Sequence, residues 1–184
     1  MVTPTHGKWV GAADYKFSDG ATRTFLLWNE REEGPHTPNA IILGFTKKDP
    51  QKMVVIWQWR PGRGGNVVIE FPGGHYGPGH EDAVSAALFH LKRETGYATA
   101  PENLIELPSL LVDPASNSAQ TVSFLGLELE KVADPEFGEN ELIEVELFTT
   151  DEILDKMATV PSANNGSMMG ALLLALHHLN KIKS

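Results

Sequence analysis

Apolar positions recur along the chain with two periods, and each period predicts one kind of secondary structure. Short apolar runs rich in Val, Ile and aromatic residues, bounded by turns such as residues 47–52, predict strands. The expected strands cover residues 8–17, 22–28, 39–46, 53–60, 66–71, 104–112, 121–130 and 141–148. Apolar residues spaced three and four apart predict helices over residues 81–95, 150–157 and 164–182.

The helix expected at residues 81–95 carries two neighbouring stripes. The apolar stripe consists of Val84, Leu88, Leu91 and Thr95, and the stripe beside it of Ala83, Ala87, His90 and Glu94. The two alanines make the second stripe thin, so another group can approach it closely. Gly96 is a natural C-terminal stop for this helix. For the last helix, Asn164 or Ser167 is the expected N-cap.

Strands on both sides of a central helix, followed by late helices, favour an α/β fold with a mixed sheet between helical layers. A chain of 184 residues fits one domain with a full core. We therefore expect a single domain over residues 1–184, in which residues 36–184 form the core. Residues 1–35 are expected to add N-terminal strands, either as a separate sheet or as a dimer arm. The glycine cluster at residues 72–79 is expected to stay outside regular structure.

Composition excludes several classes of function. The net charge is −9 and no strong basic patch occurs, which argues against nucleic acid as the partner. The absence of cysteine excludes disulfides, thiolate zinc sites and cysteine nucleophiles. The apolar runs are too short to span a membrane and the N-terminus lacks an apolar signal core, so we expect no membrane partner and a cytoplasmic location.

Candidate chemistry concentrates in residues 58–96, which read as strand, hairpin, strand, glycine loop and helix. Glu70 ends the strand before the loop, while Glu81, Asp82 and Glu94 lie on the helix that follows. Carboxylates gathered in this way usually hold Mg²⁺ or Mn²⁺, which in turn bind a polyphosphate.

The loop and helix, FPGGHYGPGHEDAVSAALFHLKRETGY at residues 71–97, resemble the Nudix box of Nudix hydrolases. Four further segments resemble the ADP-ribose and ADP-sugar pyrophosphatase branch of that superfamily. They are QWRPGRGGNVVIEFPGG, DPASNSAQ, GENELIEVELFTTDEI and ANNGSMMGALLLALHHL. The resemblance covers roughly residues 8–180 and implies a mixed sheet sandwiched between helices, in a homodimer.

The resemblance also implies the roles of individual residues. Glu94, Glu70 and the carbonyl of Gly73 would bind a divalent metal, Mg²⁺ or Mn²⁺. Glu139 or Glu141, on the loop before the last strand, would activate or orient the attacking water.

The small-molecule ligand implied by the resemblance is a nucleoside diphosphate derivative such as ADP-ribose or an ADP-sugar. Arg60 would hold its phosphate, and Phe25 or Trp28 would stack on its adenine.

The box departs from the family pattern at three helix positions. Phe89, His90 and Arg93 stand where the family has Arg, Glu and Glu, and one residue is inserted between Gly74 and Glu81. Mg²⁺ prefers oxygen ligands, and imidazole is a poor substitute. Two charges about 4 Å apart interact by about 4 kcal/mol at an effective dielectric of about 20, so replacing an acid by Arg93 should cost several kcal/mol of metal affinity. We therefore expect weakened or altered metal-dependent hydrolysis.

Three interpretations stay open at this point. The protein could bind the nucleotide without hydrolysing it, with Arg93 pairing directly with the diphosphate. It could hydrolyse through a rebuilt Mn²⁺ or Zn²⁺ site made from His90, Glu94 and Glu70, with His75 or His80. It could also be an interaction scaffold in which Arg93 only forms a salt bridge, for example to Glu94.

Overall fold

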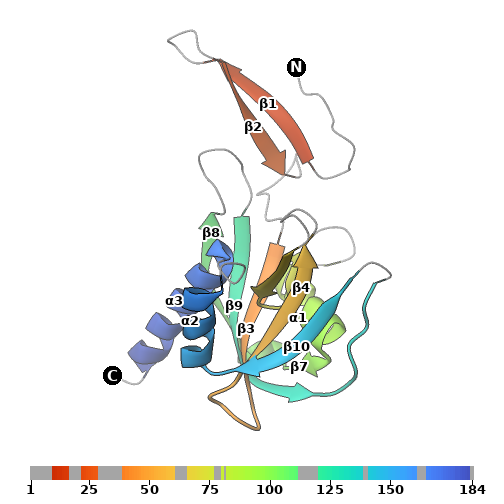
Figure 1. The fold of residues 1–184 in the computed structure, drawn as a ribbon, viewed down its shortest axis with the longest axis vertical. Helices are drawn as coiled ribbons and strands as arrows, with labels where there is room; N and C mark the ends of the chain where they lie inside the picture. Colours follow the sequence, from red (N-terminus) through yellow and green to blue (C-terminus); the bar gives the residue numbers. More distant parts are fainter. Residues whose placement is uncertain are drawn as a thin grey trace.

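The structure is a computed structural model that describes residues 10–16, 22–28, 39–60, 66–76, 80, 82–111, 120–138, 141–160 and 165–182 (Figure 1). The strands are β1 Val10–Lys16, β2 Thr22–Trp28, β3 Asn39–Thr46, β4 Met53–Arg60, β5 Asn66–Glu70, β6 Gly73–His75, β7 Tyr97–Ala98, β8 Leu104–Leu111, β9 Gln120–Lys131 and β10 Ile143–Phe148. The helices are α1 Ala83–Thr95, α2 Thr150–Thr159 and α3 Gly166–Ile182, with a 3₁₀ turn at Pro101–Asn103. No helix in this described part of the chain is both long and apolar enough to cross a membrane.

The strands form two sheets. The larger is a mixed eight-stranded sheet in which β10, β4, β3, β9 and β7 lie side by side in that order. Within it β3 and β9 run parallel, whereas the other pairs are antiparallel. Among the described residues, strands β1 and β2 pair with each other alone, in antiparallel orientation. The dimer arm that we expected from residues 1–35 stays a prediction.

The large sheet splits between β3 and β4. These two strands are in register only at Gly44–Val54 and Phe45–Met53. Beyond that point β4 pairs with β5, while the start of β3 pairs with β6. A hydrogen bond connects the chain between β5 and β6 to β3, because the Ile42 N–H donates to the Pro72 carbonyl at 3.0 Å. The split places the ends of β4 and β5, the glycine segment and α1 around one opening.

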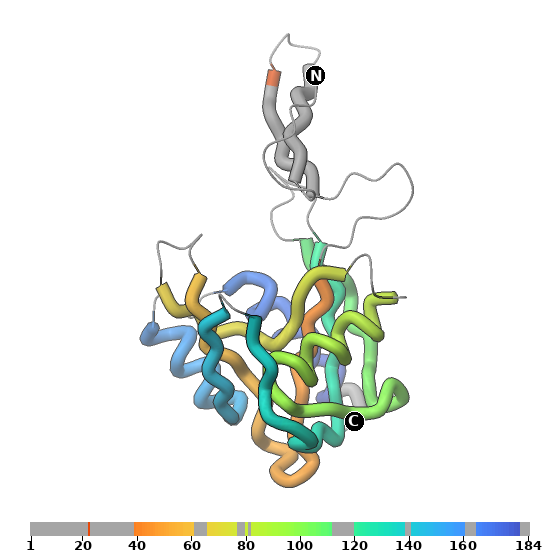
Figure 2. The backbone as a smooth tube through the Cα atoms, turned by 90° about the vertical axis from the view of Figure 1, so that its right-hand side faces the viewer, coloured from red at the N-terminus to blue at the C-terminus, as the bar shows by residue number. Residues whose placement is uncertain are grey.

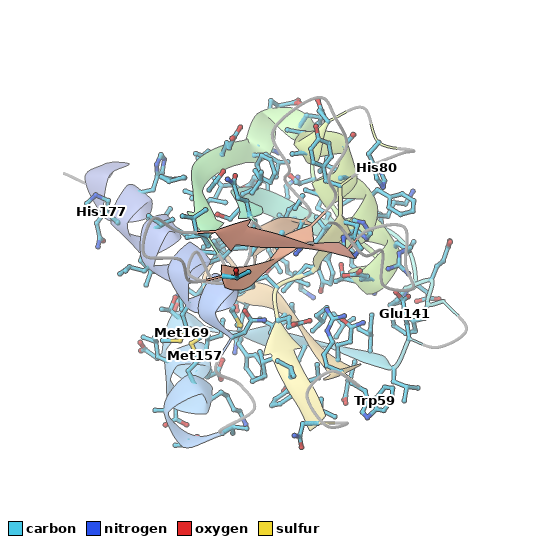
Figure 3. All side chains as sticks on the ribbon, turned by 90° about the horizontal axis from the view of Figure 1, so that it is seen from above. Trp59, His80, Glu141, Met157, Met169 and His177 are labelled. Carbon is cyan, nitrogen blue, oxygen red and sulfur yellow. The ribbon has the colours of Figure 1, made fainter. Side chains whose placement is uncertain are left out.

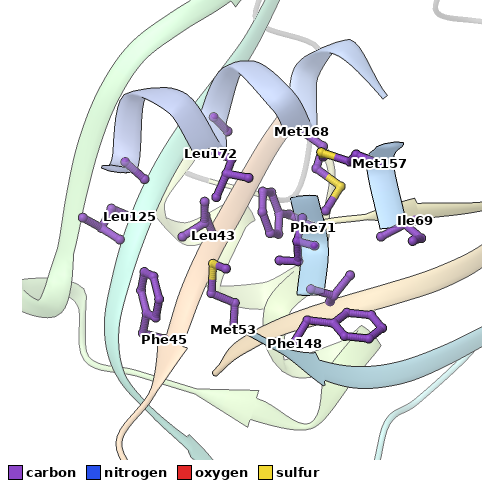
Figure 4. Close-up of a cluster of buried hydrophobic side chains, with 14 of the residues drawn as sticks. Leu43, Phe45, Met53, Ile69, Phe71, Leu125, Phe148, Met157, Met168 and Leu172 are labelled. Atoms are coloured by element: carbon purple, nitrogen blue, oxygen red, sulfur yellow. The ribbon is translucent and has the colours of Figure 1, made fainter. Parts of the chain in front are cut away.

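Helices cover both faces of this sheet (Figures 1 and 2). Side chains alternate between the two faces along β3, so Ala40 and Ile42 lie on the α1 face. There they pack with Ala86, Ala87 and Leu91. The opposite face packs against α2 and α3 (Figure 4), through a cluster that includes Leu43, Phe45, Met53, Ile153, Met157, Met168 and Leu172. The expected α/β/α sandwich is therefore confirmed.

Two helix starts differ from the sequence prediction. Helix α1 begins at Ala83, two residues later than expected, because Asp82 forms a reciprocal capping box with Ser85. It ends as expected at Gly96, which adopts the left-handed conformation with φ 69°. Helix α3 begins at Gly166, and its cap is Asn165 rather than the predicted Asn164 or Ser167.

The glycine cluster contains a strand that the sequence prediction missed. Residues Gly73–His75 form β6 and pair with the start of β3. Glycine is needed here for close approach, because a Cβ on Gly73 would lie 2.8 Å from the Cα of Ile41. A Cβ on Gly74 would lie 2.6 Å from Nε2 of His90 on α1. The glycines therefore let one short strand fit between β3 and the helix.

Candidate active-site cleft

A cavity of about 310 Å³ lies where the large sheet splits. It is lined by residues from β3, β4, β5, β6, α1 and the start of α3, and by Glu141, which lies just before β10. Its charged lining residues are Arg60, Glu70, Arg93, Glu94 and Glu141. Seen from above, Glu141 lies on the opposite side of the molecule from Met157 and His177 (Figure 3). The cleft thus brings together most of the residues that the sequence singled out.

The first group in the cleft, here the Arg60 cluster, consists of Arg60, Glu70 and Asn165. Arg60 extends from the end of β4 and donates to Glu70 Oε2 through Nε at 3.0 Å and also through Nη2. Asn165 Nδ2 donates to the other oxygen, Glu70 Oε1, at 3.0 Å. The Glu70 side chain is 16% exposed and that of Arg60 is 43% exposed. The carboxylate is therefore the fixed member of this pair, and the guanidinium is the member that solvent or a ligand can reach.

The second group, here the Arg93 cluster, consists of Arg93, Glu94 and Glu141. Arg93 donates to both oxygens of Glu141, with Nη2 to Oε1 at 3.0 Å, and Nη2 also donates to Glu94 Oε1 at 2.9 Å. Glu141 further accepts from the N–H of Gly138 at 2.8 Å. These donors, with Arg93 first, hold the pKa of Glu141 below its ordinary value, and Glu141 in turn raises the pKa of Arg93.

Glu94 is almost fully buried, with 3% of the residue exposed. A buried carboxylate needs partners for its charge. Arg93 satisfies Oε1, and the N–H of Gly73 donates to Oε2 at 3.1 Å. Glu94 therefore links the C-terminal end of α1 to the first residue of β6, and both of its oxygens are engaged.

His90 lies one helical turn before Glu94 and packs its ring against Gly74. Its Nε2 is 3.3 Å from the carbonyl oxygen of His75, which a protonated Nε2 can donate to. Its Nδ1 lies 3.5 Å from Glu94 Oε1, which is too long for a good hydrogen bond, and this buried nitrogen makes none with the described residues. The pair is a close contact that becomes an ion pair only when the imidazole is protonated.

The described residues do not fit a divalent metal on α1. The helix presents His90, Arg93 and Glu94 toward the cleft, and a guanidinium cannot be a ligand. In the described ranges, no group of three His, Asp or Glu side chains is placed so that it could hold a metal ion. Glu70, which the sequence predicted as a metal ligand together with Glu94, instead accepts hydrogen bonds from Arg60 and Asn165 on its two oxygens.

The structure leaves several predicted site residues undescribed. Glu81 and Glu139 lie outside the described residues, and for Phe25 and Trp28 only the backbone in β2 is described. Phe89 is described and is 51% exposed, with its ring centroid 5.1 Å from that of His80.

Sequence reasoning missed several polar residues of the cleft, among them Asn165 and the buried Gln58. An Asn before a helical pattern did suggest a cap, at the neighbouring Asn164. The contact between Asn165 and Glu70 joins residues 95 positions apart in the sequence, and no local pattern predicts such a contact.

A mixed sheet between helical layers, with a glycine segment and a helix at a polar cleft, defines the class of fold. Residues 35–165 match the NUDIX domain, so the chain belongs to the Nudix domain family. A comparison with curated proteins gives no match. The fold is similar to that in the crystal structure of an ADP compounds hydrolase, with a TM-score of 0.75 and 20% sequence identity over 99% of this chain and 92% of that one.

Proposed function

We propose that the cleft binds a nucleoside diphosphate derivative of the ADP-ribose or ADP-sugar type, and that its hydrolysis with Mg²⁺ is weak. Membership of the Nudix family supports the ligand class. Arg60 and Arg93 supply two guanidinium groups on the lining of one cavity, and guanidinium binds phosphate oxygens bidentately.

The observation that carries the second half of the proposal is the position of Arg93. Its side chain lies on the cleft face of α1 between Glu94 and Glu141, where it donates hydrogen bonds to both carboxylates. A divalent cation approaching these oxygens would meet a positive charge and would have to break three charge-assisted hydrogen bonds. The Arg93 guanidinium thus supplies the positive charge that a divalent metal ion would otherwise supply beside these two carboxylates.

The charges of the cleft also limit how an anionic ligand binds. Its lining carries two arginines and three carboxylates, so with neutral histidines it has an excess of one negative charge. That excess repels a diphosphate, so the ligand needs an arginine that is open enough to contact its phosphate oxygens directly. We expect it to bind Arg60 first, because Arg60 is the more exposed of the two.

Binding without any cleavage is the second candidate, and the hydrogen bonds of the two described candidate catalytic carboxylates, Glu94 and Glu141, favour it. Glu94 accepts from Arg93 and the Gly73 N–H, and both oxygens of Glu141 accept from Arg93. A general base must present an oxygen to the attacking water within about 3 Å. Each carboxylate would have to share its oxygens between these donors and the water, and pairing with Arg93 makes it a weaker base.

The test separates binding from cleavage. Thermal stabilisation by ADP-ribose is measured in EDTA, and AMP release is measured in Mg²⁺ and separately in Mn²⁺, for the wild type and Glu94→Gln. We expect stabilisation without metal and little AMP in Mg²⁺. Fast cleavage in Mg²⁺ that Glu94→Gln abolishes would overturn the weak-hydrolysis proposal, and no stabilisation at millimolar ADP-ribose would overturn the ligand class.

A gain of function completes this test. The double variant His90→Glu with Arg93→Glu gives the helix three carboxylates on its cleft face. We expect it to acquire Mg²⁺-dependent AMP release, whereas the control Lys92→Glu, which adds a carboxylate on the exposed side of α1, should not. If the double variant folds and still shows no dependence on Mg²⁺, then Arg93 is not the cause of the weak hydrolysis.

A further inference from the structure

Asn165 makes contacts with both of its side-chain amide atoms. Its Oδ1 accepts from the N–H groups of Ser167 and Met168 at 3.0 and 3.2 Å, which caps α3. Its Nδ2 donates to Glu70 Oε1 at 3.0 Å. Capping alone requires only the oxygen, so the second contact needs a separate explanation.

The second contact fixes the carboxylate that holds Arg60. Glu70 receives Asn165 on Oε1 and Arg60 on Oε2, so donors on both oxygens restrict the rotation of the carboxylate plane. Arg60 is engaged through Nε and Nη2, which set the plane of the guanidinium relative to Glu70. The orientation of Arg60 therefore depends on Asn165 through one intermediate group.

Helix α3 gives this arrangement a rigid base. Met168 and Leu172 are 1% and 2% exposed and pack into the large core on the α2 and α3 face of the sheet. The N–H groups of Ser167 and Met168 are already engaged by Asn165 itself, so the start of α3 does not offer them to an anion. What the helix contributes to the cleft is the Asn165 amide, held in place by the core.

We propose that Asn165 is a positioning residue for Arg60, which it orients through Glu70 toward the phosphate of the ligand. This inference rests on the proposed nucleotide-binding function and adds to it a residue that takes part without touching the ligand's phosphate. A ligand that uses Arg60 then gains affinity because the guanidinium is ordered before binding.

The test uses variants that separate capping from the contact with Glu70. Serine caps helices as well as asparagine does, but it is too short to reach Glu70. Asn165→Ser should therefore keep the thermal stability close to that of the wild type and lower the affinity for ADP-ribose about tenfold, as expected when a hydrogen bond to a charged group is lost.

The matched control is Thr149→Ala, which removes the side-chain cap of α2 outside the cleft. This variant should lose thermal stability and keep the wild-type affinity. If Asn165→Ser binds as tightly as the wild type, or if its affinity falls only in step with its stability, the positioning role is wrong.

A second readout does not require the ligand. The Arg60 Nε–H resonance, assigned by its loss in Arg60→Lys, reports how well the guanidinium is held. We expect its exchange with solvent to be about tenfold faster in Asn165→Ser than in the wild type, and unchanged in Thr149→Ala. Unchanged exchange in Asn165→Ser would overturn the inference even if ADP-ribose binds, whereas failure of ADP-ribose to bind the wild type would overturn only the proposed function.

Discussion

The two arginines of the cleft lie in contrasting environments. Arg60 pairs with one carboxylate, which an uncharged amide holds from the other side, and its side chain is 43% exposed. Arg93 pairs with two carboxylates, and its side chain is 21% exposed. The Arg60 cluster is therefore neutral and open, and the Arg93 cluster carries one excess negative charge and is closed.

The contrast teaches that an arginine in a cleft is not automatically an anion site. Arg60 can contact a phosphate while Glu70 stays in place, because the guanidinium has five N–H donors and Glu70 uses one edge of it. Arg93 has fewer donors to offer, because it makes three hydrogen bonds to Glu94 and Glu141 and its side chain is only 21% exposed. Arg60 should therefore contribute mainly to ligand binding and Arg93 mainly to the stability of the fold.

The largest expected effect is on binding through Arg60. Arg60→Gln removes the cation that faces the ligand and leaves Glu70 with an unpaired charge, so the affinity for ADP-ribose should fall about a hundredfold. Isothermal titration calorimetry measures the change, with the surface variant Lys48→Gln as the control for a lost charge. A loss of less than about threefold would contradict the assignment of Arg60 as the open cation.

The next effect is on stability through Arg93. Arg93→Gln leaves the buried Glu94 and the partly buried Glu141 without their cation, which should lower the free energy of unfolding by about 2 kcal/mol. Urea denaturation measures this loss, and Lys92→Gln, the exposed neighbour on α1, is the control. Equal stability of the two variants would mean that the Arg93 cluster contributes nothing measurable to the fold.

The fold was largely predictable because strands and helices have different apolar periods. The positions of β3, β4 and α2, and the end of α1 at Gly96, followed from apolar runs, turn residues and one glycine. Strand β6 was not predictable, because glycine disfavours strands in general and is used here for close approach to Ile41 and His90.

The sequence located several residues that line the cleft, but it did not predict which of them contact one another. The resemblance of residues 58–97 to a known pattern located Arg60, Glu70, His90, Arg93 and Glu94, which all line the cavity. Which carboxylate binds which arginine depends on how β4, β5 and α1 meet in space. The bonds from Arg93 to Glu141 and from Asn165 to Glu70 join positions 48 and 95 residues apart, beyond the range of any periodic pattern.

A smaller effect, of opposite sign, is expected for Glu141. If Glu141 competes with the ligand for Arg93, Glu141→Gln removes a negative charge from the cleft and should raise the affinity for ADP-ribose about fivefold. Calorimetry at low salt measures it, and Glu144→Gln, exposed on β10 and outside the cavity, is the charge-matched control. Weaker binding by Glu141→Gln alone would mean that Glu141 contacts the ligand directly.

The smallest effect is the pH dependence of the stability that Glu141 supplies. The pKa of Glu141 in the folded protein is held below its ordinary value of 4.5, first by the hydrogen bond from Arg93. A carboxylate with a lowered pKa stabilises the fold above its unfolded pKa and loses that contribution as the pH falls through its folded pKa. The difference in unfolding free energy between the wild type and Glu141→Gln should thus be constant from pH 7 to about 5 and shrink below pH 4.5.

The Arg93→Gln background sharpens this last expectation. Without Arg93 the main cause of the lowered pKa is gone and Glu141 is left without its cation, so adding Glu141→Gln there should not lower the stability at pH 7. Urea titrations of the four proteins at pH 7, 5, 4 and about 3 form a double-mutant cycle at each pH. A coupling between Arg93 and Glu141 that already declines between pH 7 and 5 would show that another group controls the pair. A coupling that vanishes only below pH 4.5 would assign the closed state of this cluster to the ionised Glu141 carboxylate.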